Sequence, residues 1–102
     1  MMRSPNNESD LINNYKAFTM NGPNMSPTIH EGDLLVIDMD QKFIISGDIY
    51  IVEYKQSTVV CRLLLDRETV TFIFDNSQHS FEEPLYNIKI LGRVIEIKTL
   101  TD

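Results

Sequence analysis

The chain of 102 residues is poor in the residues that mark several classes of protein. Its single cysteine, Cys61, excludes an internal disulfide and a cysteine-rich zinc site. It contains no tryptophan, and no apolar run approaches the roughly 18 residues that a bilayer-spanning helix needs. Residues 1–10 are polar and lack the apolar segment of a signal peptide. These absences predict a cytoplasmic protein that binds no metal and no membrane.

Basic residues are also few, nine against fifteen acidic residues, so the formal net charge is −6. The lysines and arginines are scattered along the chain. Because contacts with phosphate need clustered Lys and Arg, we do not expect this chain alone to bind nucleic acid. Nothing in the composition requires a cofactor. Hydrophobic residues make up 42% of the chain, which is usual for one globular domain of this length.

The order of polar and apolar segments predicts one β-rich domain. Residues 1–14 are polar and read as a flexible arm or a linker stub, followed by a domain over residues 15–102. Short segments rich in β-branched and aromatic residues alternate with turn formers, and residues 75–84 read as a polar loop. The predicted strands are residues 15–20, 34–37, 49–54, 58–65, 69–74 and 88–97. The pattern favours a mostly-β domain, a twisted, partly closed barrel of short strands, over an α+β domain with one N-terminal helix.

One predicted strand can be read face by face, because side chains alternate along a strand. Val59, Cys61, Leu63 and Leu65 share one apolar face of residues 57–65. A cysteine in such a row is expected to be a buried, unreactive thiol. Arg62 lies on the other face, where it is expected to reach solvent or a carboxylate.

The most distinctive segment is residues 22–33, which read Gly-Pro-Asn-Met-Ser-Pro-Thr-Ile-His-Glu-Gly-Asp. It resembles the G-D-S-M-x-P-T-(I/F)-x-x-G-D motif of LexA-type repressors and their phage relatives, in which the serine attacks a peptide bond. The motif residues kept here are Gly22, Met25, Pro27, Thr28, Gly32 and Asp33. Pro23 replaces the motif's aspartate and Asn24 its serine. An amide has no acidic proton for a base to remove, so Asn24 is not a usable nucleophile.

The resemblance extends over about residues 19–100. A family strand reading V-K-R-L supplies a lysine as general base, and the matching residues 60–63 carry Cys61 in its place. Residues 75–77 look like the family's P-x-N-S/P turn, and residues 90–95 look like its closing strand. Active relatives are cut at an Ala-Gly or Cys-Gly dipeptide, which residues 1–24 lack. The resemblance therefore implies a LexA/signal-peptidase-like fold that has lost its nucleophile, its base and its cleavage site.

The resemblance also implies a role in transcription regulation, as an inactive domain that dimerises and positions a DNA-binding partner. Nothing before Tyr15 has the length of a helix-turn-helix, which predicts an excised or standalone regulatory domain. In relatives the C-terminal region mediates self-association, although the same residues can also fill the domain's own core. The candidate interface residues are Ile88, Ile90, Val94, Ile95 and Ile97. Two alternatives are an antirepressor or co-regulator that binds a LexA-type or phage repressor, and a residual autopeptidase or Cys61-dependent enzyme.

Other polar residues in and after the motif have simpler expected roles. His30 and His79 have no second ligand at a metal-like spacing and are expected at the surface. Asn24 is expected to satisfy its own turn. Four acidic residues lie close together in the sequence. A strand about 13 Å long separates the second of them from the third, which favours a solvated acidic rim over a calcium site. These carboxylates are Glu31, Asp33, Asp38 and Asp40.

Overall fold

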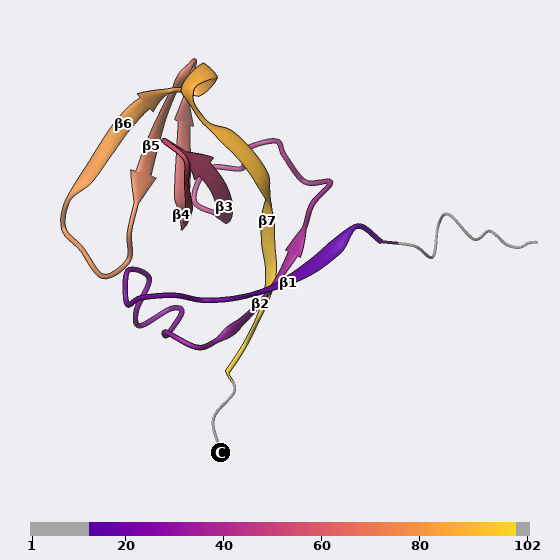
Figure 1. Cartoon of the computed structure of the whole chain (residues 1–102). Helices are drawn as coiled ribbons and strands as arrows, with labels where there is room; N and C mark the ends of the chain where they lie inside the picture. The colour runs from indigo at the N-terminus through magenta and orange to yellow at the C-terminus, as the bar shows by residue number, and fades with distance from the viewer. Residues whose placement is uncertain (1–12, 100–102) are drawn as a thin grey trace, which may run out of the picture.

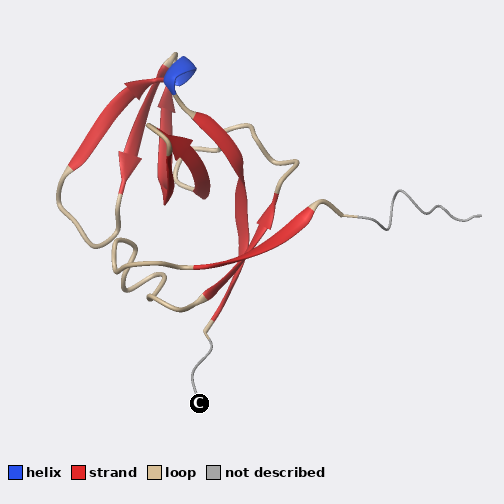
Figure 2. Ribbon diagram, viewed as in Figure 1, coloured by secondary structure: helices blue, strands red, loops and turns tan. Residues whose placement is uncertain are grey.

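Seven strands and one short helix make up residues 13–99, the part of the chain that the computed structural model describes (Figure 1, Figure 2). The helix η1 is a single 3-10 turn at Leu85–Asn87. The prediction of a mostly-β domain is confirmed, and no α-helix occurs among the described residues. The strands are β1 (Tyr15–Thr19), β2 (Leu34–Asp38), β3 (Ile49–Tyr54), β4 (Ser57–Asp66), β5 (Thr69–Ile73), β6 (Ser80–Pro84) and β7 (Lys89–Lys98).

All neighbouring strands pair antiparallel in one sheet of order β1-β2-β7-β3-β4-β5-β6. Tight turns build the central part of this sheet. Lys55 and Gln56 join β3 to β4 with φ of 50° and 67°. Positive φ at both positions is what a two-residue hairpin turn needs to match the twist of its strands. Arg67 begins an equally short turn between β4 and β5 with φ of 61°. The last strand, β7, inserts between β2 and β3.

The prediction of a polar loop over residues 75–84 is wrong for its second half, which forms β6. The ring of Phe81 stacks on that of Phe72 with centroids 4.6 Å apart, and the Tyr54 hydroxyl donates a hydrogen bond to Glu83. These inward contacts support a strand whose other residues face solvent. With only one large apolar residue, the segment has too weak a period-2 pattern to be recognised in the sequence.

Two core clusters lie on opposite faces of β3, because its side chains alternate between them. The first core cluster contains Met20, Met25, Ile29, Leu35, Ile37, Ile49 and Ile51. The second core cluster contains Tyr50, Val52, Cys61, Leu63, Val70 and Phe72. Phe74 packs against both. The central strands are therefore covered on both faces by apolar side chains of the same chain.

Strand pairing does not close the sheet into a barrel, since β1 and β6 are its two ends and do not pair with each other in residues 13–99. The sheet is nevertheless strongly curved, and the long β1–β2 loop reaches across to the β5–β6 connection (Figure 1). The Asn76 amide donates a hydrogen bond of 3.0 Å to the Asn24 carbonyl at this point. Loops, rather than a strand pair, thus bridge the two ends of the sheet.

Two residues fix the path of the β2–β3 connection and of β7. Tyr50 is fully buried, and its hydroxyl accepts a hydrogen bond from the Ile45 amide (2.7 Å) and donates one to the Phe43 carbonyl (2.9 Å). Gly92 lets β7 pass close to β2, because a Cβ there would lie 2.6 Å from the carbonyl oxygen of Asp38.

The described part of the chain holds no helix long and apolar enough to cross a membrane.

Candidate functional site

The motif loop, residues 20–33, begins and ends as an extension of the β1–β2 hairpin. The Met20 amide donates to the Asp33 carbonyl (2.8 Å), and the Gly32 amide donates to the Met20 carbonyl (2.9 Å). Gly22 and Gly32 have φ of +84° and +92°, a region that residues with a Cβ rarely adopt. The two glycines of the motif are therefore explained by the backbone of the loop.

The apolar residues of the motif anchor the loop in the first core cluster. Met25 and Ile29 are both fully buried, and the Ile29 amide donates to the Met25 carbonyl (2.8 Å). Asp33 is buried, and its carboxylate accepts a hydrogen bond from the His30 amide (2.8 Å). What the motif keeps is thus the part that shapes and anchors the loop. Asn24, at the serine position, remains exposed on top of it.

Arg62 and Asp75 form an ion pair, the Arg62–Asp75 clamp, that ties three loops to β4. The Arg62 guanidinium donates to both oxygens of Asp75 (2.8 and 2.9 Å) and to the Gly47 carbonyl (2.8 Å). The Thr28 hydroxyl of the motif loop donates to the same carboxylate (2.5 Å). The Arg62 hydrogen bonds, aided by Thr28, hold the pKa of the Asp75 carboxyl below its ordinary value. The prediction that Arg62 reaches a carboxylate is confirmed.

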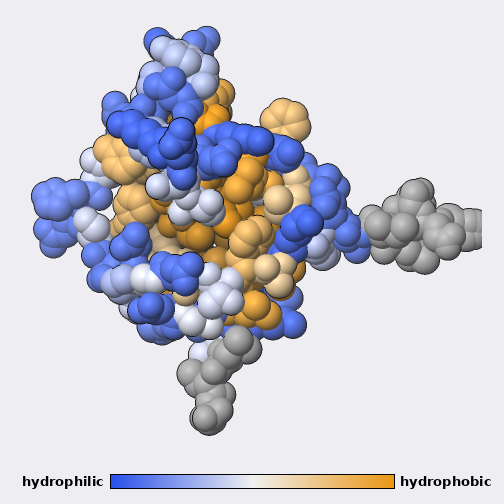
Figure 3. All heavy atoms as spheres, in the orientation of Figure 1, coloured by the Kyte–Doolittle hydropathy of each residue, from blue (hydrophilic) through white to orange (hydrophobic). Residues whose placement is uncertain are grey.

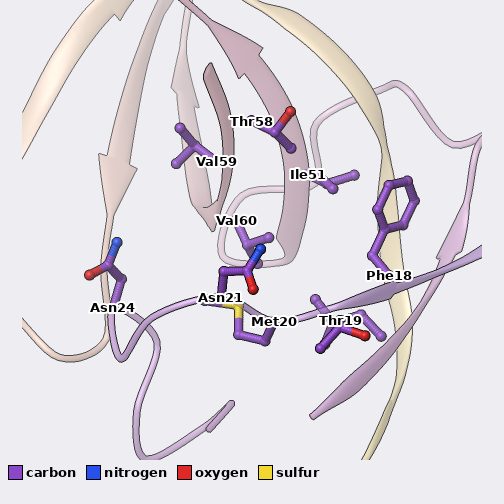
Figure 4. A pocket seen from close by; sticks show the side chains of 10 residues that line it. Phe18, Thr19, Met20, Asn21, Asn24, Ile51, Thr58, Val59 and Val60 are labelled. Atoms are coloured by element: carbon purple, nitrogen blue, oxygen red, sulfur yellow. The ribbon is translucent and has the colours of Figure 1, made fainter. Parts of the chain in front are cut away.

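A pocket of about 290 Å³ opens between the motif loop and β4. Figure 3 shows apolar side chains reaching the surface between polar rims on this face. In Figure 4, Thr58 and Val59 lie above Asn21 and Met20, and Asn24 and Phe18 lie at opposite sides of the view. The lining residues are Phe18, Thr19, Met20, Asn21, Asn24, Leu35, Ile51, Thr58, Val59 and Val60. The sequence singled out only Asn24 among them, because the others join the pocket through the curvature of the sheet.

Cys61 is fully buried in the second core cluster, as its place in an apolar row predicts. It does not line the pocket, although it shares a face of β4 with Val59, which does. Burial among apolar side chains raises the pKa of the Cys61 thiol to about 12. The thiol is therefore protonated at neutral pH.

The other polar candidates serve local structure or face solvent. His30 is exposed, with its Nδ1 atom 3.9 Å from the Asp33 carboxylate, too far for a hydrogen bond. His79 is exposed, and its backbone amide donates to the Ser77 hydroxyl. The carboxylate of Asp38 accepts a hydrogen bond from the Asp40 amide (3.1 Å). In residues 13–99, no three metal-binding side chains come together.

The candidate interface residues near the C-terminus divide into two groups. Ile88 and Ile90 pack against the second core cluster, and Val94 packs against the first. These three residues serve the domain's own core. Ile95 and Ile97 line a surface groove of about 240 Å³ beside β7, and Val94 lines it as well. Ile95 and Ile97 are not among the residues that pack against either core cluster.

Comparison with known proteins places the chain in a family. The chain belongs to the Peptidase S24-like family, which matches residues 5–95. This confirms the resemblance to LexA-type domains. The chain is also 30% identical over 89 residues to a Haemophilus influenzae protein named an uncharacterized HTH-type transcriptional regulator. The match covers 82% of this chain and 37% of that relative, so the chain spans little more than a third of the relative's length.

Proposed function

We propose that this chain is a catalytically inactive LexA-type domain that acts as the self-associating regulatory module of a transcription regulator in the cytoplasm. Membership of the Peptidase S24-like family and the likeness to a protein named an HTH-type regulator support the proposal. Helix-turn-helix proteins commonly bind DNA as dimers whose symmetry matches that of the operator. A domain with a net charge of −6 suits the dimerising part of such a protein better than the DNA-binding part.

The observation that carries the loss of catalysis is the burial of Cys61 at the position of the general base. Burial raises the pKa of this thiol to about 12, so it is protonated at pH 7. A protonated thiol neither accepts a proton from a nucleophile nor attacks a peptide bond itself. Asn24 supplies no nucleophile either, because its amide nitrogen is delocalised into the carbonyl. Both partners of a serine–lysine dyad are therefore missing, and neither substitute replaces the other.

The reactivity of Cys61 tests this interpretation directly. We expect iodoacetamide to label Cys61 in the urea-unfolded protein while leaving the folded protein unlabelled over the same time, as intact mass spectrometry would show. The thiol is shielded from the reagent and held protonated by its apolar surroundings. Labelling of the folded protein faster than that of a free thiol at the same pH would contradict the proposed loss of catalysis and support a Cys61-dependent enzyme.

Peptidase activity is tested by comparing the chain with a variant in which both dyad positions are refilled. We expect the intact mass of the natural chain to remain unchanged on long incubation. The double variant Asn24→Ser, Cys61→Lys is expected to cleave itself weakly, and only when an Ala-Gly dipeptide is also introduced before the domain. Cleavage of the natural chain would overturn the proposed inactivity.

Self-association is tested by sedimentation equilibrium from low micromolar to millimolar concentration. A reversible homodimer is the expected species. A chain that stays monomeric up to millimolar concentration but forms a heterodimer with a LexA-type or phage repressor would instead establish the antirepressor alternative. These two outcomes separate the module from a protein that acts on another repressor.

A further inference from the structure

The first turn of the motif loop joins two methionines that are firmly anchored. Met20 is buried, and both its backbone amide and its carbonyl form hydrogen bonds to the other end of the loop. Met25 is fully buried in the first core cluster. Residues 21–24 between them are exposed or half-buried. A covalent change in this turn must therefore be absorbed within four residues.

The turn contains the pair Asn21 and Gly22, the one Asn-Gly dipeptide of the sequence. An asparagine in this setting is prone to lose its amide, because the backbone nitrogen of the next residue can attack the side-chain carbonyl carbon and close a five-membered imide. A Cβ on the next residue hinders the attack, and glycine has none. The attacking nitrogen must also give up its proton, which is easiest when no hydrogen bond holds that proton.

The backbone around Gly22 leaves this nitrogen available. Asn21 is exposed to solvent. Within residues 13–99, no hydrogen bond holds the Gly22 amide. A Cβ built on Gly22 would meet nothing within 4 Å, so the space beside the residue is open. Water can therefore reach the turn, both to take the amide proton and to open the imide.

Other exposed asparagines lack these features. The amide of Ser77, which follows Asn76, donates to a backbone carbonyl (3.0 Å). The amide of Ile88, which follows Asn87, also donates to a backbone carbonyl (3.3 Å). Asn24 is followed by a fully buried methionine, so an attack by the next nitrogen would displace an anchor of the loop. Hydrogen bonding and packing thus protect these three side chains from the reaction.

We propose that Asn21 is a site of spontaneous deamidation, which converts one side chain of the pocket wall from neutral to negatively charged. The Gly22 nitrogen loses its proton and bonds to the side-chain carbonyl carbon of Asn21, and the side-chain nitrogen leaves as ammonia. Water then opens the imide at either of its two carbonyl carbons. The products are aspartate and isoaspartate, in which the side-chain carbon has become part of the backbone. The net reaction consumes one water, releases one ammonia and involves no oxidation or reduction.

Both products change the pocket that Asn21 lines together with Met20 and Val60 (Figure 4). Each places a carboxylate beside apolar side chains and adds one negative charge to a chain whose net charge is already −6. Isoaspartate also lengthens the backbone by one carbon between the two anchored methionines. The pocket of an aged chain therefore differs in charge, and in one product also in shape, from that of a newly made chain. The inference does not depend on the proposed inactivity or self-association.

Ageing the folded chain in heavy-oxygen water tests the proposal. Peptide mapping by mass spectrometry should show the new oxygen at position 21 before it appears at any other asparagine of residues 13–99. Aspartate and isoaspartate peptides should both appear as separate chromatographic peaks, and their rate of formation should rise with pH, because the nitrogen must lose its proton. Aspartate alone would overturn the imide route. Modification of Asn76 or Asn87 ahead of Asn21 would overturn the assigned site.

Variants separate the roles of the two residues. Asn21→Gln keeps an amide but would need a six-membered ring, so position 21 should stay unmodified over the same time. Gly22→Ala keeps Asn21, adds a methyl group beside the attacking nitrogen and should slow the reaction about tenfold or more. Asn76→Gln is the matched control and should leave the rate at Asn21 unchanged. Thermal melting checks that each variant is folded. Equal rates in wild type and in folded Gly22→Ala would overturn the role of Gly22.

Unfolding in guanidinium chloride tests the contribution of the structure. It releases the Ser77 amide from its hydrogen bond, so modification of Asn76 should accelerate on unfolding by a larger factor than that of Asn21. An equal acceleration at both positions would overturn the argument from hydrogen bonding. A folded chain that remains intact at Asn21 after the unfolded chain has been fully modified there would overturn the proposal as a whole.

Discussion

Removal of the Arg62 side chain is expected to be among the most damaging changes to a residue that is not fully buried. Arg62→Ala removes two hydrogen bonds to Asp75 and one to the Gly47 carbonyl. It leaves the carboxylate of Asp75, only 14% exposed, with the Thr28 hydroxyl as its remaining side-chain partner. Hydrogen bonds to charged groups contribute about 1.5–3 kcal/mol. Arg62 is one-third exposed and therefore partly screened, so we expect a total loss of about 2–3 kcal/mol.

A loss of this size is a large part of the roughly 5–15 kcal/mol that stabilises a domain of about 100 residues. It should lower the melting temperature by roughly 10–20 °C and shift the midpoint of urea unfolding to lower concentration. Arg93→Ala is the matched control, because Arg93 is similarly exposed but forms a longer ion pair. Its guanidinium comes no closer than 3.5 Å to the Asp48 carboxylate. Its expected cost is below about 1 kcal/mol. A loss at Arg62→Ala no greater than at Arg93→Ala would refute the reasoning.

The clamp also predicts how stability depends on pH. The pKa of Asp75 is lowered in the folded protein, mainly by Arg62, so its ionisation favours folding at pH values above its unfolded pKa of about 4. That contribution should be lost as the pH falls from about 5 through the lower folded pKa. Asp75→Asn should therefore be less stable than wild type at pH 7, and the difference should shrink in acid. Parallel stability curves for the two proteins would contradict this account.

Two further substitutions test the packing around the sheet. Gly92→Ala places a methyl group 2.6 Å from the Asp38 carbonyl oxygen, and the strand shift that relieves this contact should cost about 1–3 kcal/mol or more in urea unfolding; wild-type stability would show that the contact is not limiting. Tyr50→Phe leaves the Ile45 amide and the Phe43 carbonyl without their partner, at about 1–3 kcal/mol, and should speed hydrogen exchange at Ile45. Unchanged exchange there would mean that the hydroxyl does not hold the loop.

Local features of this domain could be predicted from the sequence because short-range chemistry determines them. The positive φ of Gly22 and Gly32 follows from the turn that the motif makes. The burial of Cys61 follows from strand alternation, and so does the outward direction of Arg62. The identity of the partner of Arg62 did not follow, since Asp75 lies 13 residues away along the chain and reaches Arg62 only through the β4–β5 pairing.

Features that depend on several distant segments could not be predicted. β6 is held by Phe72 and Tyr54, which belong to other strands, and its own sequence is mostly charged or polar. The predicted barrel closure depends on how strongly the sheet curves, which no single segment encodes. The pocket arises where that curvature brings the motif loop toward β4, so its members share no sequence pattern that would mark them in advance.

The strand order has a consequence for the way the chain folds. Because β7 lies between β2 and β3, residues near the start and the end of the chain must meet before the sheet is continuous. Sheets that depend on such distant pairings fold slowly, since the entropy of closing the intervening loop is lost before the strands gain contacts. During synthesis, the meander from β3 to β6 can form early, whereas β1 and β2 can join it only after β7 has been synthesised.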